Sequence, residues 1–119
     1  MKIVYIAGPY TGPNAWAIEQ NVRKADEVGL YVAECGAMPI IPHTNTRFFH
    51  GLLTPEFWYE GTLELLRRAD ALMMVPGWEH STGAKAERLE AERLLKLVFY
   101  FGDGGSEQAF EKWLLDEHR

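Results

Sequence analysis

Four short apolar runs, each followed directly by glycine or proline, restrict what this chain can fold into more than any other feature. Longer stretches with the spacing of helices separate them. Strands that are apolar throughout are typical of parallel sheets, in which helices cover both faces. We therefore expect strands over the four runs Lys2–Ala7, Met38–Ile41, Ala71–Val75 and Leu97–Phe101.

The stretches between and after these runs contain helix-forming residues at helical spacing. Thr54 and Pro55 are typical of a helix start, and Gly36 is typical of a helix end. Alternating strands and helices imply right-handed crossovers and a doubly wound α/β sheet. The length of 119 residues predicts a single domain over residues 1–119. The expected helices are Asn14–Cys35, Pro55–Arg68, Gly83–Lys96 and Ser106–Glu117, and Pro42–Leu53 is expected to be irregular.

The balance of charge limits the partners of the chain. Twelve Lys and Arg against 17 Asp and Glu give a net charge of −5, whereas binding of nucleic-acid polymers needs a basic face. No apolar run approaches the roughly 20 residues of a membrane span, and the N-terminus lacks the features of a signal peptide. The single cysteine, Cys35, excludes an internal disulfide. We expect a cytoplasmic protein that binds no membrane and no nucleic-acid polymer; small nucleotides are compatible with this charge.

Ligands of such sheets bind beyond the carboxyl ends of the strands. The segment Gly8–Gly12, after the first run, lacks the third glycine of a dinucleotide-binding fingerprint. The segment Gly77–Lys85 lacks the spacing of a phosphate-binding loop, and Ala86 stands where such a loop requires Ser or Thr. Both cofactor patterns fail, so we expect no cofactor.

Glu87 is the residue that the local pattern explains least. Ser81 or Thr82 can cap a helix whose first turn contains Gly83, where N–H groups attract an anion. A capping box that starts at either residue does not involve Glu87. At about 100° per residue, Glu87 falls within an apolar stripe formed by Ala84, Ala91, Leu94 and Leu95. A carboxylate there is costly unless it is solvated or paired, so the residues alone leave open a glutamate at the rim and a functional carboxylate.

Two other groups of residues have simpler interpretations. His43 and His50 flank Arg47 in the irregular stretch, and without an acidic residue at regular spacing we expect a loop and no metal site. Trp58 and Tyr59, near the start of the second helix, are interpreted as core or interface aromatics. Neither group is predicted to bind a ligand.

Two segments of the chain resemble a known family. The opening VYIAGPYTG and the later stretch RRADALMMVPGWEHSTGAKAERLEA are similar to the nucleoside 2-deoxyribosyltransferase-like superfamily, most closely to its small members of the DUF4406 type. The shared pattern is a strand ending in AGP, an Ala-Asp that opens a later strand, Pro-Gly-Trp, and Ser-x-Gly-Ala-x-x-Glu-x-x-x-Ala. The order of strands and helices agrees over nearly the whole chain. The resemblance implies a flavodoxin-like (Rossmann-like) three-layer fold with four or five parallel strands.

The resemblance also implies roles for individual residues. Glu87 occupies the position of the family's nucleophilic glutamate, and Tyr5 that of an active-site tyrosine in the branch of 2′-deoxynucleoside 5′-monophosphate N-glycosidases. Thr62 stands where the family's enzymes usually carry an aspartate that helps to place the base or sugar. Pro9 and Thr11 stand where the N-glycosidase branch has Ser and Arg. The expected substrate-binding residues are Gly8, Pro9, Gly12, Ser81, Gly83, Thr62 and, from a neighbouring subunit, Ser106.

The function that the resemblance implies is cleavage or transfer at the N-glycosidic bond of a (deoxy)nucleoside or nucleotide. Glu87 would attack C1′ and form a covalent glycosyl-enzyme, which water or a second base would resolve. The alternative, which Thr62 favours, is a non-catalytic module that binds a nucleotide or nucleotide sugar; a redox flavoprotein of similar topology is a third. A homodimer or larger homo-oligomer is expected, because one small domain cannot cover all the apolar side chains of its helices. The apolar side chains on which this expectation rests are Phe57, Trp58, Leu65, Ala86 and Leu89.

Overall fold

The computed structural model describes residues 1–49 and 51–117, and the predicted alternation of strands and helices is confirmed. The strands are β1 (Ile3–Ala7), β2 (Met38–Ile40), β3 (Ala71–Met74) and β4 (Leu97–Tyr100). The helices are α1 (Ala15–Glu34), α2 (Pro42–Asn45), α3 (Pro55–Arg68), α4 (Thr82–Arg93) and α5 (Gly104–Glu117), and a 3-10 turn, η1 (Trp78–His80), precedes α4. The short helix α2 interrupts the stretch that was expected to be irregular. None of the helices in the described ranges is long and apolar enough to span a membrane.

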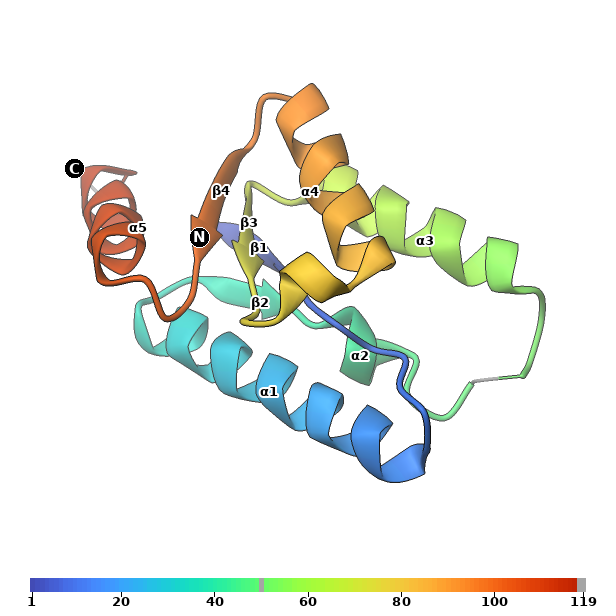
Figure 1. Ribbon diagram of the computed structural model, residues 1–119. Helices are drawn as coiled ribbons and strands as arrows, with labels where there is room; N and C mark the ends of the chain where they lie inside the picture. The colour runs from blue at the N-terminus through green and yellow to red at the C-terminus, as the bar shows by residue number, and fades with distance from the viewer. Residues whose placement is uncertain (50, 118–119) are drawn as a thin grey trace.

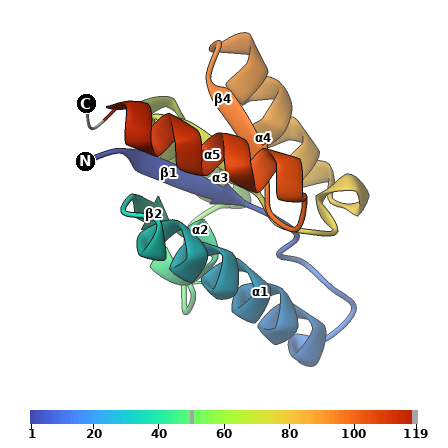
Figure 2. The ribbon, with the colours of Figure 1, turned by 90° about the vertical axis from the view of Figure 1, so that its left-hand side faces the viewer.

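The four strands form one parallel sheet in the order β2-β1-β3-β4. In this register Val4 of β1 lies opposite Pro39 of β2 and Ala71 of β3. Helices α1 and α5 pack on one face of the sheet, and α3 and α4 cover the other face (Figures 1 and 2). The chain is therefore a three-layer α/β fold of the flavodoxin-like type. Of the four or five strands that were predicted, the described residues form four.

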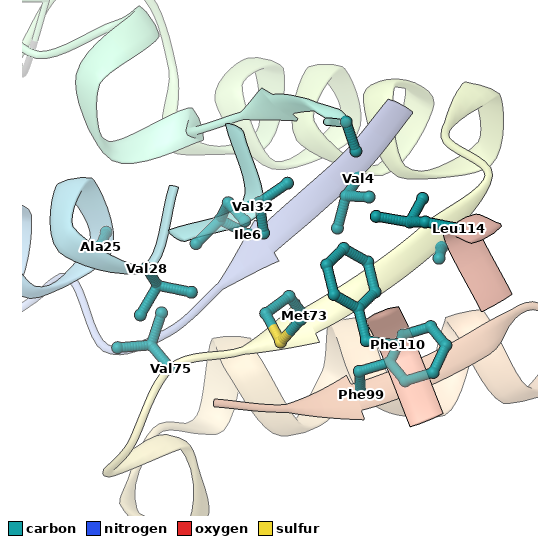
Figure 3. Packing of buried hydrophobic residues seen from close by; sticks show 12 residues of the cluster. Val4, Ile6, Ala25, Val28, Val32, Met73, Val75, Phe99, Phe110 and Leu114 are labelled. Carbon is teal, nitrogen blue, oxygen red and sulfur yellow. The ribbon is translucent and has the colours of Figure 1, made fainter. Parts of the chain in front are cut away.

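Two apolar clusters hold the helices against the sheet, because successive residues of a strand point to opposite faces. Ile6 of β1 packs on the side of α1 and α5, whereas its neighbour Tyr5 packs on the side of α3 and α4. The first cluster, drawn in Figure 3, includes Val4, Ile6, Val28, Met73, Phe99 and Phe110. The second cluster includes Tyr5, Ala7, Leu66, Leu72, Met74, Ala84 and Ala91. Tyr5 extends from this second cluster to α4, where its hydroxyl group meets a polar side chain.

Helices α1 and α4 end in the same kind of backbone turn, but only α1 has a glycine in it. Gly36 follows α1 with φ of 99°, as predicted for a glycine at a helix end. Leu95 takes the equivalent place after α4 with φ of 59°, and the next N–H, that of Lys96, donates to the carbonyl of Ala91 at 2.9 Å. The expectation that Leu94 and Leu95 continue the helical stripe is wrong, because α4 ends before them and Leu95 is 91% exposed.

Strand β2 lies at an edge of the sheet and has a proline at its centre. The N–H of Met38 donates to the carbonyl of Lys2, on the side of β1, at 2.9 Å. Because successive backbone nitrogens alternate in direction along a strand, the nitrogen of Pro39 points away from β1 toward the open edge. After β2 the chain turns through α2 and reaches α3 across the carboxyl end of the sheet (Figure 1).

Candidate active site

A pocket of about 630 Å³ opens at the carboxyl end of β1, where parallel sheets usually bind ligands. Its walls come from the β1–α1 loop, from α2 and the segment after it, from α3 and from the start of α4. The residues predicted for the site that line this pocket are Tyr5, Gly8, Thr62, Ser81, Gly83 and Glu87. The fold thus brings together side chains from three separate parts of the sequence.

The side chains of Glu87 and Tyr5 meet at the wall that β1 and α4 form. The fully buried Tyr5 donates its hydroxyl hydrogen to Oε2 of Glu87. Burial raises the pKa of Glu87 to about 7, and the hydrogen bond from Tyr5 opposes this rise. Burial, followed by the Glu87 carboxylate, raises the pKa of Tyr5 well above its ordinary value, so the phenol stays protonated. The pair therefore holds a carboxyl group that changes its charge near neutral pH, as general bases and nucleophiles often do.

Thr62 of α3 lines the same pocket and lies beside the phenol of Tyr5. Its hydroxyl group donates to the carbonyl of Tyr59 at 2.9 Å. The contact with the Thr62 hydroxyl group lowers the pKa of Tyr5, against the larger effects that raise it. Among the described residues that line the pocket, Glu87 is the sole carboxylate. A threonine at this position thus leaves the pocket with one carboxyl group.

The amino-terminal end of α4 faces the pocket. Ser81 is the N-cap, and its Oγ accepts the N–H of Ala84 at 3.1 Å. This selects Ser81 over Thr82 as the capping residue. Gly83, in the first turn, has no heavy atom within 4 Å of the place where a Cβ would be. The positive end of the helix dipole therefore lies beside open space, and an electronegative group of a ligand would be stabilised there.

Three residues predicted for substrate binding do not line this pocket. Pro9 presents its carbonyl to another part of the protein, at 2.8 Å from Nε2 of His43. Gly12 lies so close to α1 that a Cβ on it would be 2.7 Å from that of Ala17. Ser106 of α5 accepts the backbone N–H of Tyr100 at 2.7 Å, which fixes the β4–α5 connection. Its expected role in the site of a neighbouring subunit remains a prediction.

The pocket is also lined by residues that were not predicted from the sequence to bind a ligand. Trp58 and Tyr59, interpreted as core or interface aromatics, line its wall, as do Tyr10 and His43. Trp58 donates from Nε1 to the carbonyl of Leu52 at 2.6 Å, which ties α3 to the segment before it. The place of Trp58 and Tyr59 in the sequence could have indicated this role. Both aromatics lie one turn after Pro55, at the end of the helix that is nearest to the carboxyl edge of the sheet.

In the part of the chain that the structure describes, no group of three or more His, Cys, Asp or Glu side chains is placed to hold a metal ion. Burial lowers the pKa of His43, and the hydrogen bonds to backbone carbonyls oppose this shift. The second histidine considered in the sequence analysis, His50, lies outside the described residues.

Two solved structures have folds similar to that of this chain. The fold is similar to that of a 2-desoxiribosyltransferase from Leishmania mexicana, with a TM-score of 0.62 and 20% identity over 85% of this chain and 64% of that one. It is also similar to a 2-deoxyribosyltransferase from Bacillus psychrosaccharolyticus, with a TM-score of 0.60 and 21% identity over 82% of this chain and 70% of that one.

The chain thus spans less than two thirds of the length of the Leishmania protein. No curated protein matches the sequence significantly. Residues 2–100 match the family described as Domain of unknown function (DUF4406). The chain therefore belongs to the DUF4406 family, and its fold is similar to that of the two 2-deoxyribosyltransferases.

Proposed function

We propose that the pocket binds a nucleoside and that Glu87 cleaves or transfers its N-glycosidic bond through a covalent glycosyl-enzyme. The observation that carries this proposal is the hydrogen-bonded pair of Glu87 and Tyr5 in the wall of the pocket. The hydrogen bond from Tyr5 to Oε2 fixes the orientation of the Glu87 carboxylate and leaves Oε1 available to react. The phenol of Tyr5 stays protonated, because its pKa is raised well above the ordinary value. Such an oriented carboxylate is suited to nucleophilic attack on a sugar carbon.

The remaining lining of the pocket fits an uncharged nucleoside. Its volume lies within the range of about 300–1,000 Å³ that is usual for small-molecule sites. Tyr10, Trp58 and Tyr59 supply aromatic surface for a planar base. Among the described residues of the lining there is no Lys or Arg to pair with a 5′-phosphate. We therefore expect nucleosides to be better substrates than their 5′-monophosphates.

The proposed reaction has two steps. The Glu87 carboxylate attacks C1′ while the C1′–N bond breaks, and the base leaves with the bonding electron pair and takes a proton from water. Water or a second base then attacks C1′, which releases the free sugar or a new nucleoside and restores the Glu87 carboxylate. Because Glu87 attacks only when ionised, and burial raises its pKa to about 7, the rate of the first step is expected to rise with pH through about 7.

A non-catalytic nucleotide-binding module is the second candidate function. It is favoured by Thr62, because a threonine hydroxyl group is too weak an acid to protonate a leaving base, and this one is bonded to the Tyr59 carbonyl. Such a module would bind the same ligands without releasing the base. Binding without turnover therefore separates the two functions.

The test is a panel of nucleosides and 5′-monophosphates incubated with the protein, with the free base followed by chromatography. Base release is expected for at least one nucleoside, and addition of a second base separates transfer from hydrolysis. Glu87→Gln should abolish release while the ligand still binds, measured by calorimetry. Glu90→Gln, on the same helix but outside the pocket, is the matched control and should keep wild-type rates. Release that persists in Glu87→Gln, or binding without any release in the wild type, would exclude the proposed mechanism.

A further inference from the structure

His43 is a buried polar side chain that the proposed chemistry does not use. It belongs to α2 and is 8% exposed. Its Nε2 lies 2.8 Å from the carbonyl oxygen of Pro9, in the loop between β1 and α1. A carbonyl oxygen can only accept a hydrogen bond, so Nε2 carries the hydrogen and donates. The ring of His43 also packs edge-on against Tyr10, with 5.5 Å between ring centroids and 87° between planes.

The two carbonyls that follow Pro9 in this loop are held by a second side chain. Nδ2 of Asn21, in α1, donates to the carbonyl of Tyr10 at 3.1 Å and to that of Thr11 at 3.3 Å. Three consecutive carbonyls of a segment without regular secondary structure are therefore bonded to side chains from two different helices. The same segment lines the pocket through Tyr10 and Thr11.

We propose that His43 and Asn21 are positioning residues that together hold the loop from Gly8 to Gly12 in the conformation that receives the substrate. The proposal rests on the proposed function for the identity of that substrate. His43 belongs to α2 and Asn21 to α1, so two separate helices hold the loop. His43 holds one carbonyl of the loop and Asn21 holds two, and backbone carbonyls need such partners when they are withdrawn from water.

The surroundings of His43 agree with a structural donor. Burial lowers the pKa of its ring, so the ring is neutral near pH 7 and donates from Nε2 alone. The acidic group that faces it is Asp26 of α1, and this carboxylate opposes the lowering of the pKa. Asp26 is itself bonded to the hydroxyl group of Thr44 at 2.7 Å. The rings of His43 and Tyr10 pack edge to face, and both residues line the pocket.

The first measurement follows the loop in the absence of any ligand. His43→Phe keeps a ring against Tyr10 but removes the donor, and His43→Gln keeps an N–H that can reach the Pro9 carbonyl. In the wild type, backbone NMR order parameters of Tyr10, Thr11 and Gly12 are expected near the rigid value of about 0.85. They should fall below about 0.6 in His43→Phe and in Asn21→Ala, and His43→Gln should restore them. Thr44→Ala removes a neighbouring α2–α1 hydrogen bond without touching the loop, so it should leave them unchanged.

The second measurement connects the loop to the substrate. His43→Phe and Asn21→Ala should each raise Kd and KM for the best nucleoside by about tenfold, with a smaller change in kcat, as expected when binding geometry is lost. Asn21 does not line the pocket, so its effect can reach the substrate only through the loop. An effect on KM in the His43 variants alone would overturn the proposal, and so would unchanged order parameters in both His43→Phe and Asn21→Ala. A wild type that binds no nucleoside would refute the proposed function, while the loop measurement would still test the positioning role.

Discussion

At the scale of single residues, the contact between Glu87 and Tyr5 couples the charge of the pocket to the stability of the fold. The pKa of Glu87 is raised from 4.5 to about 7 in the folded chain, so between these pH values the folded state binds more protons than the unfolded state. The stability that this group supports is fully present below pH 4.5 and is lost as the pH rises through about 7. At pH 8 and above, the loss is on the order of 3 kcal/mol.

Glu87→Gln should remove this pH dependence. The amide has no charge, and its oxygen still accepts the hydrogen bond from Tyr5, whereas alanine would leave the buried Tyr5 hydroxyl group without this partner. The melting temperature of Glu87→Gln relative to wild type is expected to increase between pH 5 and pH 9. In Glu90→Gln, whose carboxylate lies outside the pocket and is paired with Arg93, the difference should stay constant above pH 6. If Glu87 is instead needed as a structural anion, Glu87→Gln will melt below wild type at pH 8.

Thr62→Asp tests whether the lack of a second carboxyl group in the pocket limits the activity. An aspartate at this place could supply the proton that the departing base needs, as an acid near the reacting atoms commonly does. Base release is expected to rise, or to become measurable where the wild type has none. Thr62→Asn has the same shape without the acid and should show no gain. An equal rate in both variants, measured by chromatography over the full nucleoside panel, would contradict the prediction.

At the scale of the elements, the turn after α4 contains a strained residue. Leu95 has φ of 59°, a conformation that glycine adopts freely and that costs other residues about 1–2 kcal/mol. The side chain is 91% exposed, so little packing is lost on its removal. Leu95→Gly is expected to raise the free energy of unfolding by about 0.5–1 kcal/mol, because the greater freedom of glycine in the unfolded chain offsets part of the relieved strain.

The matched control is Lys85→Gly, at an exposed position of α4 that has no part in the expected interface. Glycine in a helix interior costs about 1 kcal/mol, so this variant should be less stable than wild type. Urea unfolding of the two variants and of the wild type gives both differences directly. Destabilisation by Leu95→Gly would show that the leucine makes a contact that outweighs its backbone strain.

The same turn illustrates how far the sequence alone can predict these elements. Glycine and proline marked the ends of most strands and helices, because both residues restrict or release the backbone locally. The end of α4 was missed because Leu95 occupies a position where glycine is usual. Ser81 and Glu87 were predicted from helix geometry and resemblance, whereas the role of Trp58 in the pocket was not. Periodicity identifies the apolar face of α3, but the contact between Trp58 and Leu52 depends on the irregular segment before it.

At the scale of the whole molecule, the prediction of an oligomer now depends on fewer side chains than the sequence suggested. Trp58 is used within the chain, against Phe49 and the carbonyl of Leu52, and Leu65 packs on the core. Ala86 is partly buried. Phe57 and Leu89 remain 53% and 59% exposed, on α3 and α4, the two helices that cover one face of the sheet. Exposed apolar side chains on adjacent helices are typical of an interface between copies.

We expect a dimer or larger assembly through this face, and Phe57→Lys combined with Leu89→Lys should convert it to a monomer. Light scattering at micromolar concentration measures the mass of each form. Leu30→Lys, at an exposed position of α1 on the opposite face, should leave the mass unchanged. A wild-type protein with the mass of one chain would contradict the expectation.

The proline in β2 has a consequence for how copies of this chain meet. An edge strand usually offers a row of N–H and carbonyl groups to which another strand can add, and this is a common route to fibrils. At the β2 edge the nitrogen of Pro39 faces outward and carries no hydrogen, so a strand from a second copy finds no donor there. Polymerisation by continuous sheet extension is therefore blocked on this side, and crowded solutions of the protein should resist fibril growth from β2.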